Sequence, residues 1–77
     1  MNTLAINKST IANELWFRDE KLYVVLDDGR ELAVPVDWFP KLRDATDKQR
    51  NNWRFIGGGE GIHWEELDED ILVEGLL

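Results

Sequence analysis

Apolar residues recur mostly at every second position between residues 13 and 35, which is the period of a β-strand with one buried face. Turn-forming residues at 18–21 and 27–30 divide this stretch into three segments. Asp28-Gly29 in the second turn indicates a hairpin, because both residues tolerate a positive φ at little steric cost. The pattern predicts a three-stranded antiparallel meander with two apolar faces: Leu15, Phe17, Leu22, Val24, Leu26, Leu32 and Val34 on one, and Trp16, Tyr23 and Val25 on the other.

Short helical segments are expected after the meander. Pro35 limits the third strand, because proline lacks the N–H that a strand ladder needs. Residues 41–45 then predict one or two helical turns. Thr46 and Gln49 stand at the spacing of a capping box, in which each side chain bonds the backbone N–H of the other residue. A second short helix is therefore expected over residues 46–52.

A glycine-rich turn interrupts the last third of the chain. Residues 53–56 alternate as a short strand, and the glycines between 57 and 61 end it. No Lys-Ser or Lys-Thr pair follows these glycines, as it would in a phosphate-binding loop. We expect instead a turn that brings Ile62 and Trp64 to the sheet.

The fold class follows from these segments. Residues 68–71 predict a helical turn, and the apolar residues 72–77 predict a tail docked on the domain. A chain of 77 residues is enough for one domain and too short for two. We expect an α+β fold with a small antiparallel sheet, the N-terminal meander, packed with one or two short helices. The single domain is expected over residues 13–77, after a flexible N-terminus over residues 1–12.

Charge is segregated along the chain. The net charge is −7, yet the nine Lys and Arg residues balance the first nine acids, and Arg54 is the last base. A C-terminal segment of one sign repels phosphate backbones, so direct nucleic-acid binding is not expected. The seven acids that carry the imbalance are Glu60, Glu65, Glu66, Asp68, Glu69, Asp70 and Glu74.

Two further classes of protein are not expected. The chain has no cysteine, so it has neither a disulfide framework nor a thiolate that could attack a substrate or bind a metal. No apolar run of about 18 residues occurs, and the first residues lack the basic and apolar regions of a signal peptide. We expect a cytoplasmic protein that does not contact the membrane.

Several motifs after Asn13 carry a family resemblance: Trp38-Phe39-Pro40 with Leu42 and Ala45, Gln49-Arg50 before Trp53, Gly57-Gly58-Gly59 leading into Gly61-Ile62-His63-Trp64, and Leu67-Asp68-Glu69-Asp70-Ile71 before Val73-Glu74-Gly75-Leu76-Leu77. With these motifs nearly the whole chain resembles the small bacterial domain-of-unknown-function family numbered 2442. One departure is Glu65, at a position where proline is common in similar proteins.

The resemblance implies a compact α+β fold with a small antiparallel sheet and no established activity. Similar proteins are often encoded beside another small protein, in an arrangement like a toxin–antitoxin pair. Some relatives carry an added helix-turn-helix domain, which this chain is too short to include. The resemblance therefore brings no expectation of DNA binding.

His63 is the one histidine, and it lies among acids in the sequence. A zinc protease motif would need two histidines at helical spacing, and a calcium loop would need a glycine where Ile71 and Leu72 stand. Three readings remain open: a structural hydrogen bond or ion pair that raises the pKa of His63, contact with a protein partner, or a small enzyme or ligand site using His63 with Asp68 or Asp70. We expect no metal and no cofactor.

Four tryptophans cannot all be enclosed in so small a domain: Trp16, Trp38, Trp53 and Trp64. We expect two or three of them in the core. Trp38 is the candidate interface anchor, because it lies on a turn beside Pro40.

The leading functional hypothesis is a non-catalytic protein-interaction module, regulatory or antitoxin-like. Dense like charges repel one another, so a basic protein partner, encoded nearby, would relieve a cost that the acidic C-terminal surface already carries. A homodimer through the second face of the meander or through Leu76-Leu77 is a further hypothesis. The candidate partner-binding residues are Trp38, His63, Glu65, Glu66, Asp68, Glu69 and Asp70.

Overall fold

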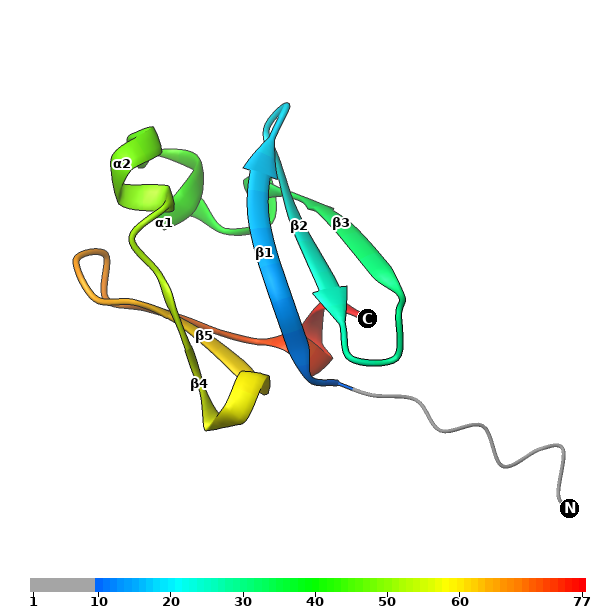
Figure 1. The fold of residues 1–77 in the computed structure, drawn as a ribbon. Helices are drawn as coiled ribbons and strands as arrows, with labels where there is room; N and C mark the ends of the chain where they lie inside the picture. Colours follow the sequence, from blue (N-terminus) through cyan, green and yellow to red (C-terminus); the bar gives the residue numbers. More distant parts are fainter. Residues whose placement is uncertain (1–9) are drawn as a thin grey trace, which may run out of the picture.

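The computed structural model describes residues 10–77, which form two three-stranded antiparallel sheets joined by two short helices (Figure 1). The first sheet has the order β1-β2-β3: β1 (Ala12–Arg18), β2 (Lys21–Leu26) and β3 (Glu31–Pro35). The connection contains three short elements: the 3-10 turn η1 (Val36–Trp38), α1 (Pro40–Arg43) and α2 (Asp47–Arg50). The second sheet has the order β4-β5-β6: β4 (Arg54–Ile56), β5 (Gly61–Trp64) and β6 (Glu69–Leu72), with η2 (Gly57–Gly59) inside it and η3 (Val73–Leu76) after it. None of the helices in residues 10–77 is long and apolar enough to cross a membrane.

The predicted meander and the α+β class are confirmed. Leu15 lies opposite Val24, and Leu22 lies opposite Val34, so the buried residues of neighbouring strands share one face. The structure adds a second sheet, in which the strand at residues 69–72 was not expected from the sequence.

The two turns of the meander differ in backbone conformation. Asp19 and Glu20 form a two-residue turn with φ of 52° and 60°, a left-handed conformation that L-residues adopt at a cost of about 1 kcal/mol each. In the second turn Gly29 has a φ of 92°, whereas Asp28 keeps a negative φ. The hairpin at Asp28-Gly29 is therefore confirmed, but only the glycine uses the left-handed region.

Local signals place the helices correctly. The Thr46 side chain accepts a hydrogen bond from the Gln49 backbone N–H at 3.1 Å, and the Thr46 N–H donates to the Gln49 side chain at 2.9 Å. This is the predicted capping box, and it fixes the start of α2.

Two predictions are wrong, one on the type of an element and one on where the first strand begins. Residues 68–71 do not form a helical turn, because Ile71 pairs with Ile62 across β5 and β6 and both side chains enter the core. Ala12 is buried and paired with Leu26, so it belongs to β1 rather than to a flexible N-terminus. Residues 1–9 of that predicted segment lie outside the described residues.

The hydrophobic core lies between the two sheets. Leu22 and Val24 from β2 face Ile62 and Trp64 from β5, and all four are fully buried. Leu42 of α1 is also part of this core, as are two residues of the C-terminal tail: Val73 and Leu76. The predicted docking of the tail is therefore confirmed for these residues, while Leu72 and Leu77 are exposed.

The glycine turn makes a close backbone contact with the first sheet. Gly59 is buried with a φ of 105°, and a Cβ atom there would lie 2.6 Å from the carbonyl oxygen of Ala12. Only glycine allows β1 and η2 to approach this closely. The turn thus brings the second sheet to the first, as the sequence predicted for this segment.

Candidate functional site

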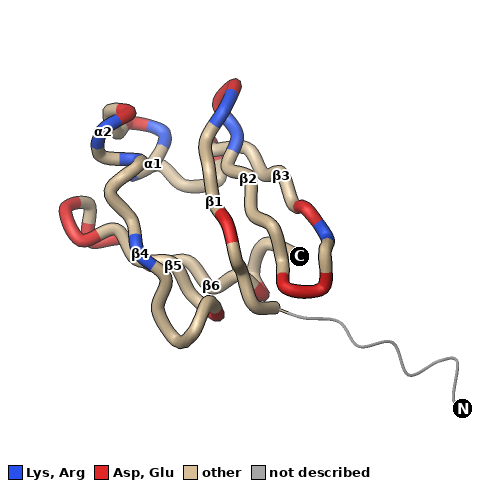
Figure 2. Tube along the Cα trace, viewed as in Figure 1, with Lys and Arg blue, Asp and Glu red and all other residues tan. Residues whose placement is uncertain are grey.

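Five of the seven acids of the C-terminal segment lie on one hairpin, formed by β5, β6 and the turn at residues 65–68, which we call the acidic hairpin. Figure 2 shows this turn as a red loop beside the helices. Trp64 pairs with Glu69, and Asp68 closes the turn with a φ of 50° and an N–H that bonds the Glu65 carbonyl oxygen. The hairpin carries all five of the predicted partner-binding acids: Glu65, Glu66, Asp68, Glu69 and Asp70.

His63 lies on the outer face of the second sheet because its neighbours in β5, Ile62 and Trp64, face the core. Strand pairing places Arg54 on one side of it and Asp70 on the other. The His63 Nδ1 atom lies 2.5 Å from Asp70 Oδ1, and the Nε2 atom lies 2.5 Å from Glu65 Oε2. Two carboxylates therefore hold the ring from its two nitrogens, and 16% of the side-chain surface stays exposed.

These contacts favour the charged imidazolium. The hydrogen bond with Asp70, followed by that with Glu65, raises the pKa of His63 above its ordinary value. The same contact with His63, with help from Arg54 at 3.7 Å, lowers the pKa of Glu65. Only the protonated ring can donate from both nitrogens at once, so this geometry suits a cation between two anions.

The two carboxylate contacts bear on acid–base chemistry at His63. Both ring nitrogens already have carboxylate partners, which leaves neither to accept a proton from a substrate. Within residues 10–77 no group of three or more His, Asp or Glu side chains is placed to hold a metal ion. Asp68, the other proposed partner of His63, instead presents its carbonyl oxygen to Lys41 Nζ at 2.9 Å.

The remaining acids have weaker attachments. Glu66 Oε2 accepts a hydrogen bond from the Gln49 side chain at 2.6 Å, which ties the turn to α2. Among residues 10–77, the Glu69 side chain accepts only from the backbone N–H of Asp70, at 3.1 Å. Neither Glu66 nor Glu69 touches His63, so their charges can be changed without removing its two partners.

The four tryptophans divide between core and surface. Trp64 is fully buried and Trp53 packs against the core, whereas Trp16 lies half-buried outside it. Trp38 is 60% exposed. It lies three residues before Lys41, whose side chain contacts the acidic hairpin. Trp38 is therefore a surface residue, and its role as an interface anchor stays a prediction.

A structural centre that the sequence did not reveal surrounds Arg50. This arginine is only 6% exposed, and its Nε donates to the Leu42 carbonyl oxygen at 2.8 Å. Nη2 donates to the Arg43 carbonyl oxygen at 2.9 Å, and both Nη atoms reach the Glu20 carboxylate at 3.1 Å. The Arg50 carbonyl oxygen also accepts from the Trp64 indole at 2.9 Å.

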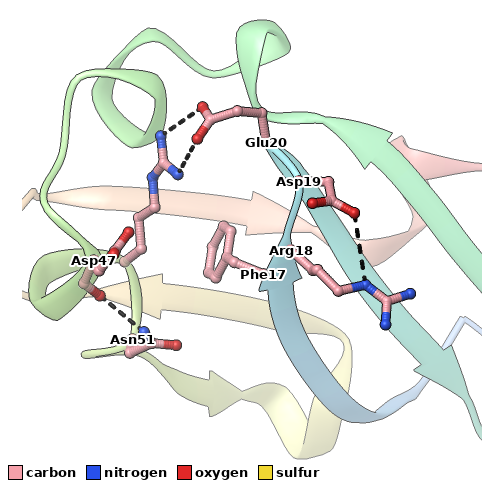
Figure 3. A pocket seen from close by; sticks show the side chains of 7 residues that line it. Phe17, Arg18, Asp19, Glu20, Asp47 and Asn51 are labelled. Atoms are coloured by element: carbon pink, nitrogen blue, oxygen red, sulfur yellow. Dashed lines mark hydrogen bonds and ion pairs between the residues drawn. The ribbon is translucent and has the colours of Figure 1, made fainter.

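Arg50 thus links both sheets to the helices. Its bidentate contact holds Glu20 in the left-handed turn, and it lowers the pKa of that carboxyl, first through the hydrogen bond and then through charge. Beside the pair lies an open hollow of about 300 Å³ (Figure 3), lined by Phe17, Arg18, Asp19, Glu20, Asp47, Arg50 and Asn51. We interpret this cluster as structural, because all three nitrogens of the Arg50 guanidinium donate hydrogen bonds to acceptors within the protein.

Comparison with known proteins gives a family and no activity. No curated protein matches the chain. A protein of unknown function from Rhodospirillum rubrum ATCC 11170 has a similar crystal structure, with a TM-score of 0.77 and 30% sequence identity over 91% of this chain and 86% of that one. The model of one family, "Protein of unknown function (DUF2442)", matches residues 12–77. The chain therefore belongs to the DUF2442 family of proteins of unknown function, as its motifs predicted.

Proposed function

We propose that this protein is a non-catalytic interaction module, regulatory or antitoxin-like, that binds a basic protein through the acidic hairpin. The observation that carries the proposal is the gathering of five acids on one exposed turn and its flanking strands. Their neighbours supply three bases, His63, Arg54 and Lys41, so an excess of negative charge remains even when His63 is protonated. Such a surface attracts a positive partner and speeds its association.

Trp38 supports the same proposal. A tryptophan that is 60% exposed offers a large apolar area, which binding could remove from water at the side of a charged rim. Charges then select the partner, and the indole contributes affinity. The host's own basic protein, encoded near this one, is the expected partner.

The test is affinity purification of the tagged protein from its host at low and high salt, followed by mass spectrometry. The variant Glu66→Lys with Glu69→Lys reverses two charges and leaves Glu65 and Asp70 on His63. The control Asp27→Lys with Glu74→Lys makes the same change in net charge at two exposed acids outside the hairpin.

We expect a basic protein to co-purify at low salt with the wild type and with the control. High salt should release it, because exposed charges are screened within about 10 Å at 0.1 M salt. The hairpin variant should not capture it, because two of the acids that attract the basic partner have become lysines. Recovery of the chain alone at both salts contradicts the proposal. Equal capture by the hairpin variant and the control contradicts it as well.

A further inference from the structure

The outer face of the first sheet is the second unusual surface of this molecule. Trp16, Tyr23 and Val25 lie there half-buried, and none of them belongs to the core or packs against it. Trp16 and Tyr23 stack on each other with ring centroids 5.4 Å apart and planes at 2°. Among residues 10–77, no helix or strand covers this face, since the core lies on the opposite side of the sheet (Figure 1).

Strand register arranges the charges of this face in rows. The central row is apolar and contains Trp16, Tyr23 and Ala33, which pair across the three strands. The row on one side is acidic, because Glu14 and Glu31 flank Val25. The row on the other side is basic, because Arg18 and Lys21 stand in it beside Pro35.

The face is therefore neutral, with two acids and two bases, in a chain whose net charge is −7. Each charged row lies two residues from the central row, which is roughly 7 Å along the strands. A partner must offer acids opposite the basic row and bases opposite the acidic row. A strongly basic or strongly acidic protein would be repelled by one of them.

From this charge pattern we propose that the outer face of the first sheet binds a second copy of the same chain. A two-fold axis along the Trp16–Tyr23–Ala33 row turns the acidic row of one copy onto the basic row of the other. Glu14 then lies against Arg18 of the second copy, and the aromatic residues stack about the axis. An axis along the strands is excluded, because it places acids on acids and bases on bases.

The size of the face sets the strength of the dimer. Three strands about 4.8 Å apart and five residues at about 3.3 Å each give a patch far smaller than the roughly 800 Å² per partner of a stable complex. We expect a weak dimer that forms as protein concentration rises, because interfaces of this small size are typical of transient complexes.

The test is sedimentation velocity over a range of concentrations with two complementary double variants. Glu14→Lys with Glu31→Lys makes the face wholly basic, and Arg18→Glu with Lys21→Glu makes it wholly acidic. All four side chains are exposed, so thermal unfolding should show that each variant keeps its fold. We expect the wild type to self-associate, each variant alone to stay monomeric, and an equal mixture of the two to form a heterodimer.

Formation of a heterodimer by the mixture of two variants that are each monomeric is the result that only a face of paired charge rows explains. A wild type that stays monomeric at every concentration overturns the proposal and leaves the face to a different occupant. Self-association that neither double variant weakens, or a mixture that stays monomeric while the wild type dimerises, overturns it too. The variant Glu66→Lys with Glu69→Lys should dimerise like the wild type, so this result is independent of the acidic hairpin.

Discussion

Replacement of Arg50 by methionine tests the structural centre between the two sheets. Methionine keeps much of the aliphatic volume but removes every donor of the guanidinium. The Leu42 carbonyl oxygen then loses a buried partner that now lies at 2.8 Å, and the Arg43 carbonyl oxygen loses one at 2.9 Å. Glu20 is 71% exposed and can be hydrated instead, so its share of the loss is small.

The expected cost follows from these unequal surroundings. A buried acceptor without a partner costs about 1–3 kcal/mol. The Leu42 oxygen is fully buried but still accepts from the Ala45 N–H at 3.2 Å, so among the described contacts only the partly buried Arg43 oxygen is left without a donor. We therefore expect Arg50→Met to lower the free energy of unfolding by about 2 kcal/mol. In a domain of this size that loss corresponds to roughly 8–16 °C in Tm.

Urea denaturation followed by tryptophan fluorescence measures this loss, since the buried Trp64 indole donates to the Arg50 carbonyl oxygen. Arg43→Met is the matched control, because Arg43 is exposed and pairs only with its neighbour Asp44 among the described contacts of its side chain. The control should unfold close to the wild type. A loss below about 1 kcal/mol for Arg50→Met would show that water replaces the guanidinium and that the reasoning is wrong.

Two further predictions concern the glycine turn and His63. Gly59→Ala should destabilise the fold by at least about 2 kcal/mol in thermal or urea unfolding, because the φ is left-handed and the methyl group meets the Ala12 backbone. Gly75→Ala has open space and should be nearly neutral; equal behaviour of the two variants would contradict the close approach. The raised pKa of His63 means that its ion pairs stabilise the fold fully below the unfolded-state pKa of about 6.5, and that this contribution is lost as pH rises through the folded-state pKa. The free energy of unfolding of the wild type should fall over that range, and His63→Gln should lack the fall; identical pH profiles would refute the assignment.

Local signals allowed the sequence to predict the capping box of Thr46 and Gln49 and the turn at Gly29. Each depends on residues a few positions apart, whose backbone chemistry is the same in many folds. The strand at residues 69–72 was missed because it carries two acids, Glu69 and Asp70, which are uncommon in strands. Its pairing with β5, and not its own composition, makes it a strand.

The candidate site was predictable where it is local in sequence. Glu65 lies two residues from His63 and Asp70 lies seven away, so a charged cluster could be inferred, although not which acid holds which nitrogen. Arg50 was not singled out, because its carboxylate partner lies 30 residues away. The paired charge rows on the first sheet were hidden for the same reason, since only strand register brings Glu14 and Glu31 into line.

The most direct test of the acidic hairpin is the affinity of the purified protein for its co-purified partner, measured by titration calorimetry over a series of salt concentrations. We expect the dissociation constant of the wild type and of the Asp27→Lys, Glu74→Lys control to rise steeply with salt. The Glu66→Lys, Glu69→Lys variant should bind more weakly at low salt and show a shallower salt dependence. The same affinity and the same salt slope for all three proteins would contradict the account.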